Sequence, residues 1–112
     1  MPEIGDGVYE AIWNKTPRIR LKQIHDHIKY QKLEPLSAER LRDELIEFGE
    51  KLAIAPRSHE AINELSNDRF EYRTATYKKV YRFIFRINEK KKHVVITNLF
   101  HNKRHPKKLK KN

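Results

Sequence analysis

Apolar and polar residues alternate over residues 80–87, which is the clearest pattern in the chain. One set is apolar or aromatic (Tyr81, Phe83, Phe85, Ile87) and the other carries two arginines (Val80, Arg82, Ile84, Arg86). A period of two predicts a β-strand with one buried face. Residues 88–92 (NEKKK) are too polar for a core and predict a hairpin turn. His93–Phe100 is rich in β-branched and aromatic residues, so we expect a second, well-buried strand there.

The start of the chain predicts a strand and then a helix. Residues 8–13 (VYEAIW) are apolar and partly alternating, as in a short strand. Three aliphatic residues then recur at helical spacing and predict a helix over residues 17–30: Leu21, Ile24 and Ile28. Thr16 is suited to cap this helix. Pro17 is expected at its first position, where a missing N–H costs nothing.

A second helix is predicted after a loop marked by Pro35. Ser37 is a candidate N-cap, and Pro56 is expected to stop the helix. An apolar stripe runs along it at spacings of three and four: Ala38, Leu41, Leu45, Phe48 and Leu52. Two amphipathic helices joined by a short loop predict an antiparallel helical hairpin.

The remaining segments complete an α+β pattern. Residues 57–68 read as a polar loop, Arg69–Thr76 alternates like a strand, and residues 77–79 form the link to the next strand. The predicted order is β-α-α-β-β-β. We expect an antiparallel sheet that the first strand joins, with the helical hairpin on one face. The opposite face must stay partly polar, and three arginines are expected to project from it: Arg73, Arg82 and Arg86.

The charge of the chain is unevenly distributed. The 112 residues carry a net charge of +10, but residues 1–56 are net −1 and residues 57–112 are net +11. A basic half of this size favours an anionic partner, either nucleic acid or an acidic protein segment. The charge alone does not distinguish between them, and it is also compatible with a surface that merely keeps a small domain soluble.

Composition narrows the class of protein. The length predicts one domain, which we place at residues 1–106, followed by a basic tail over residues 107–112. With no cysteine, disulfides and thiolate metal sites are excluded. No signal sequence or membrane span is predicted, so we expect a cytoplasmic protein that makes no membrane contact. No cofactor motif is present. His25 and His27 point in different directions on a helix, and no metal site is expected.

Four strings in the right order resemble the RelE/ParE superfamily of bacterial type II toxins. They are AIWNKTPRIRLKQIHDHI, KLAIAPRS, YRFIFRI and VVITNLFHNKRHP, and the resemblance covers roughly Tyr9 to Pro106. The hairpin NEKKKH, about two residues longer than expected, and the lysine-rich tail depart from the family. The resemblance implies a growth-arresting toxin that a cognate antitoxin protein holds inactive.

The superfamily divides by target, and the resemblance leaves both branches open. RelE-like toxins cleave mRNA on the ribosome, whereas ParE-like toxins act on DNA gyrase by binding. The histidine-then-arginine ending (His101, Arg104) favours the ParE-like branch. The segment after the second helix also lacks a RelE-type lysine pair, with Lys51 and Arg57 only. A basic nucleic-acid-binding module without toxicity is a further alternative.

The candidate site residues depend on the branch. For RNA cleavage, Arg82, His101 and Arg104 would supply a proton donor and cations for the transition state, provided that the strands bring them together. For a binding function, the candidates are cationic: Arg73, Arg82, Arg86, Lys103 and Arg104. Arg82 has a plain structural alternative, an ion pair with an acidic neighbour such as Glu71, and His101 could simply bond to backbone at a strand end. Arg104 could equally be an anion-binding contact.

Overall fold

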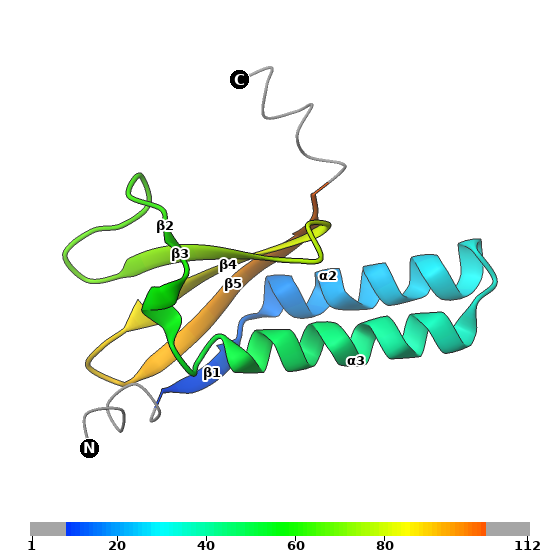
Figure 1. Cartoon of the computed structure of the whole chain (residues 1–112), viewed down its shortest axis with the longest axis horizontal. Helices are drawn as coiled ribbons and strands as arrows, with labels where there is room; N and C mark the ends of the chain where they lie inside the picture. The colour runs from blue at the N-terminus through cyan, green and yellow to red at the C-terminus, as the bar shows by residue number, and fades with distance from the viewer. Residues whose placement is uncertain (1–8, 103–112) are drawn as a thin grey trace.

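The computed structural model describes residues 9–102, which form two helices packed against one face of a five-stranded sheet (Figure 1). The elements in chain order are β1 (Glu10–Trp13), α2 (Lys15–Asp26), the π-helical turn η1 (His27–Gln31), α3 (Pro35–Lys51), the 3₁₀ turn η2 (Pro56–Ser58), β2 (Glu60–Ala61), β3 (Glu71–Tyr77), β4 (Tyr81–Asn88) and β5 (His93–His101). The predicted α+β class is confirmed. Val8 and the tail 107–112 lie outside the described residues.

The sheet is mixed, with strand order β1-β5-β4-β3-β2. β1 pairs parallel with β5, and the other neighbours are antiparallel. The first strand therefore joins the β3-β4-β5 meander, as predicted. The two-residue strand β2 was missed because Glu60 and Ala61 lie within a polar loop that has no alternating pattern.

The buried face of the sheet is the one that alternation predicted. Phe83, Phe85 and Ile87 are buried, and they pack with residues of β5 and with the stripe of α3. Of that stripe, Leu45 and Leu52 are fully buried, while Leu41 and Phe48 lie partly buried against the same cluster. Removal of this apolar surface from water is the main force that holds hairpin and sheet together.

Several predicted helix boundaries are wrong. α2 begins at Lys15, and Pro17 is its third residue, buried under the helix start; the preceding residue is Asn14 rather than the predicted cap Thr16. α3 begins at Pro35, because proline is well tolerated in a first turn, so Ser37 is inside the helix. It ends at Lys51, before Pro56, which instead begins η2.

A β-bulge in β5 sets which side chains face the helices. Ile84 lies opposite Asn98, but the next residue, Phe85, lies opposite Ile96. Thr97 is thus the extra residue, and its hydroxyl donates to the Ile84 carbonyl at 3.2 Å. Because of the bulge, Ile96 and Leu99 share the helix-covered face although they are an odd number of residues apart.

Candidate functional site

Arg82 lies on the sheet face that the helices leave open. It pairs across strands with Thr76 and Phe100 and has the opposite orientation from its buried neighbour Phe83. Its Nη1 donates to the Thr74 hydroxyl at 3.1 Å and its Nε to the Asn102 side-chain oxygen at 3.4 Å. Both partners are neutral, and the Glu71 ion pair considered from sequence does not form, because Glu71 binds Arg73 and Arg57 instead.

His101 lies on the other face of the sheet. It pairs across strands with Tyr81, and the two rings meet edge to face with centroids 5.1 Å apart. Burial raises the pKa of the Tyr81 hydroxyl, which therefore stays protonated at neutral pH. Since neighbouring strand positions point to opposite faces, Arg82 and His101 are directed away from each other. The structure does not bring these two candidates together.

Arg73 is the one arginine whose predicted orientation is wrong. It pairs with Phe85 and so shares the helix-side face, beyond the end of α3. Its Nη1 donates to the His59 carbonyl at 2.5 Å, and its guanidinium pairs with Glu71. Only 17% of its side chain is exposed. These bonds connect η2 and the start of β2 to β3. The role of Arg73 in this structure is therefore to stabilise the fold.

Arg86 projects from the open face, as predicted. Its guanidinium lies over the ring of Phe70, 4.5 Å from the centroid, which is a cation–π geometry. Its Nε is buried and has no hydrogen-bond partner in the part of the chain that the structure describes. Lys103 and Arg104, the other cationic candidates, lie outside the described residues.

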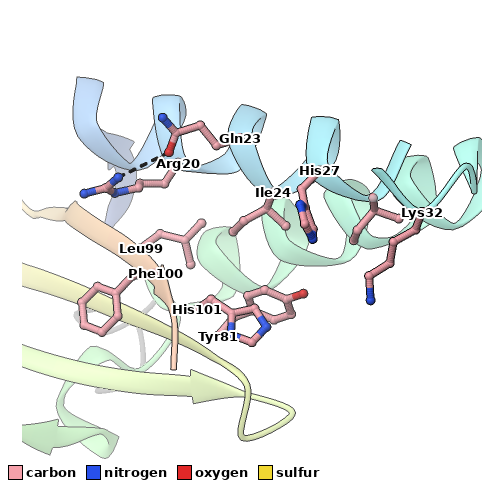
Figure 2. A pocket seen from close by; sticks show the side chains of 10 residues that line it. Arg20, Gln23, Ile24, His27, Lys32, Tyr81, Leu99, Phe100 and His101 are labelled. Carbon is pink, nitrogen blue, oxygen red and sulfur yellow. Dashed lines mark hydrogen bonds between the residues drawn. The ribbon is translucent and has the colours of Figure 1, made fainter. Parts of the chain in front are cut away.

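A groove opens on the helix side, between α2 with η1 and the ends of β4 and β5 (Figure 2). Its volume is about 470 Å³. Among the described residues its lining contains no carboxylate and consists of basic, aromatic and aliphatic side chains with one amide: Arg20, Gln23, Ile24, His27, Ile28, Lys32, Tyr81, Leu99, Phe100 and His101. Sequence reasoning missed this groove, although Arg20, Gln23, Ile24 and His27 follow one another at spacings of three, one and three, as residues on one helix face do.

A charged cluster closes the opposite end of the sheet. Arg57 donates to the hydroxyl of Tyr9 at 2.9 Å and pairs with both Glu71 and Glu89. Hydrogen bonds from Lys92, then Tyr9, then Arg57 lower the pKa of Glu89 to about 2. The cluster joins η2, the start of β1 and the β4–β5 turn, so its role is to hold these loops together.

The described residues contain neither a candidate metal site nor a candidate membrane-spanning helix. Within residues 9–102, no group of three or more histidine, aspartate or glutamate side chains is arranged to hold a metal ion. No helix in that range is both long and apolar enough to cross a bilayer.

The architecture is similar to that of two toxin–antitoxin structures. A chain of the chromosomal ParDE TA system from P. aeruginosa superposes with a TM-score of 0.68 at 17% identity, over 85% of this chain and 97% of that one. The chain has the RelE/ParE fold. A chain of the toxin–antitoxin complex RelBE2 from Mycobacterium tuberculosis superposes with a TM-score of 0.52 at 22% identity, over 83% and 90% of the two chains.

The likeness lies in the three-dimensional structure. No protein-family model and no curated protein matches the sequence. At 17% and 22% identity, these superpositions establish the fold and carry no residue roles with them. The ParDE chain fits with the higher TM-score of the two.

Proposed function

We propose that this protein is the toxin of a type II toxin–antitoxin system and arrests bacterial growth by binding DNA gyrase, as ParE-like toxins do. The fold supports the first part, because both similar structures are of toxin–antitoxin systems. The higher TM-score of the ParDE chain, 0.68 against 0.52, supports the ParE-like branch.

The separation of Arg82 from His101 is the observation that favours a binding mechanism over RNA cleavage. Metal-free cleavage of RNA needs a proton donor or acceptor beside the cation that stabilises the transition state. Arg82 instead contacts the neutral groups of Thr74 and Asn102, while His101 faces the helices. A surface that binds its target requires no such pair.

An antitoxin partner is part of the proposal. Residues 57–112 carry a net charge of +11, which an acidic, amphipathic protein segment would complement. Toxin, antitoxin and gyrase would then meet in the bacterial cytoplasm.

The test is controlled expression in bacteria that carry a DNA-damage reporter. We expect growth arrest together with induction of the reporter, while protein synthesis continues at first. Co-expression of a cognate antitoxin, to be sought as a short acidic protein in an adjacent reading frame, should restore growth. Abrupt loss of translation with codon-positioned mRNA cuts would instead identify a RelE-like endonuclease. If expression is harmless, the remaining hypothesis is a basic nucleic-acid-binding module without toxicity.

A further inference from the structure

The groove beneath α2 and η1 gathers one lysine and two histidine side chains at one end. His27 and Lys32 come from the helical side, and His101 comes from the end of β5 (Figure 2). In this view the imidazole of His27 and the amine of Lys32 are directed toward the strand end where His101 and Tyr81 lie. The Tyr81 hydroxyl adds a neutral hydrogen-bond donor at the same end.

The other end of the groove is apolar with a polar edge. The partly exposed Ile24 forms its side above the fully buried Leu99, and Arg20 and Gln23 lie beside Ile24, joined by a hydrogen bond of 3.3 Å (Figure 2). Aliphatic walls with a few polar groups are what a small planar ligand requires, and a volume of about 470 Å³ is in the range of small-molecule sites.

We propose that this groove binds a nucleoside 5′-phosphate, with the phosphate between His27, Lys32 and His101 and the base against the partly exposed Ile24. A phosphate monoester offers three oxygens, and the three basic side chains and the Tyr81 hydroxyl supply matching donors. Because the described residues that line the groove include no carboxylate, none of these side chains repels the anion. A base has polar edges as well as a flat apolar face, which suits Gln23 and Arg20 beside the aliphatic walls.

This inference is independent of the proposed toxin function. The groove uses the helix-covered side of the sheet, whereas Arg82 and Arg86 belong to the open face. The ligand could be a free mononucleotide or the phosphorylated 5′ end of a strand, since both present the same chemical group.

The experiment is calorimetric titration of the full chain with adenosine 5′-monophosphate, with adenosine and inorganic phosphate as partial ligands. We expect saturable binding of the nucleotide and at least tenfold weaker binding of each part. His27→Gln, Lys32→Gln and His101→Gln should each weaken binding by about fivefold or more, because each removes a charge-assisted hydrogen bond. His93→Gln and Lys90→Gln are matched controls at the far end of the sheet and should stay within about twofold, as expected for charges outside the contact.

A second titration identifies the source of the phosphate. A short single-stranded oligonucleotide is compared with and without its 5′-phosphate. Tighter binding of the phosphorylated strand than of the mononucleotide assigns the site to strand ends, and the reverse assigns it to free nucleotides. The proposal is overturned if neither the mononucleotide nor the phosphorylated strand binds saturably, or if the control variants lose as much affinity as the groove variants. Thermal unfolding of each variant checks that it is folded.

Discussion

Gly49 of α3 lies directly against the indole of Trp13. A Cβ atom at position 49 would overlap the Trp13 ring and would also meet the Ile96 Cδ1 at 3.1 Å. The missing side chain therefore lets α3 approach the sheet, while the indole Nε1 donates to Glu50 at 3.1 Å. This contact fixes the distance between hairpin and sheet.

Gly49→Ala should therefore destabilise the protein, although alanine is the better helix former. We expect a loss of about 1–3 kcal/mol from overpacking, which outweighs the roughly 1 kcal/mol gained in helix propensity. Urea denaturation measures the free energy of unfolding. Glu47→Ala, on the exposed side of the same helix, is the control and should change it by less than about 0.5 kcal/mol. A more stable Gly49→Ala variant would show that Trp13 moves aside freely.

Glu89 should make stability depend on pH in the acid range. Its pKa is lowered from 4.5 to about 2 in the folded state, first by Lys92 and then by Tyr9 and Arg57. A depressed carboxyl pKa stabilises the fold above the unfolded value of 4.5, and this contribution disappears as pH falls toward 2. Because half of the side chain is exposed, the contribution is at most about 1 kcal/mol.

Glu89→Gln tests this dependence. The variant should be less stable than the wild type at pH 7 and equally stable near pH 2, as measured by urea denaturation across that range. A stability difference that stays constant down to pH 2 would contradict the role of the Glu89 charge.

Arg73 and Arg82 should differ in their contribution to stability. Arg73→Ala leaves the His59 carbonyl and the Glu71 carboxylate without a largely buried partner, so we expect a loss of about 2 kcal/mol. Arg82→Ala removes bonds to two neutral side-chain groups and should cost about half as much or less. Thermal unfolding of both variants gives the comparison, and equal losses would argue against a structural role specific to Arg73.

Leu33 is a candidate for stabilisation. Its φ of 56° lies in the left-handed region, which strains a leucine, and the residue is 78% exposed. Leu33→Asn should raise stability by about 0.5–1 kcal/mol, because asparagine adopts this conformation more readily. Leu36 has the same exposure but lies in the first turn of α3, so Leu36→Asn should give no such gain. Equal effects on the unfolding midpoint would show that the gain comes from replacing an exposed leucine by a polar residue, and not from relief of backbone strain.

His101→Ala should leave growth arrest largely intact if the protein acts by binding gyrase. An interface contact costs little when removed unless it is a hot spot, whereas loss of a general acid lowers a cleavage rate by about 10² or more. The measurement is growth after induction, together with primer extension on ribosome-bound mRNA. If the wild type makes codon-positioned cuts in mRNA and these cuts vanish in the variant, the RNA endonuclease hypothesis is favoured instead.

Local patterns in the sequence determined most of the architecture. Alternation identified β4 and its buried face, and the spacing of Leu45 and Leu52 identified the face of α3 that packs on it. These predictions succeed because period two and period 3.6 are properties of the chain itself. Helix boundaries were less predictable, since Thr16 and Ser37 had good cap chemistry but lie inside the first turns of their helices.

The tertiary structure alone decided the arrangement of the site. Simple alternation from the buried Ile96 would turn His101 to the open face, on the side of Arg82; the bulge at Thr97 turns it to the helix side. A bulge depends on the pairing partner across the ladder, so no period within β5 reveals it. The groove likewise joins His27 and Lys32 to His101, residues about 70 positions apart that only the packing of α2 on β5 brings together. Local sequence patterns thus determined the fold and the basic character of the chain. Tertiary packing determined which basic side chains face one another.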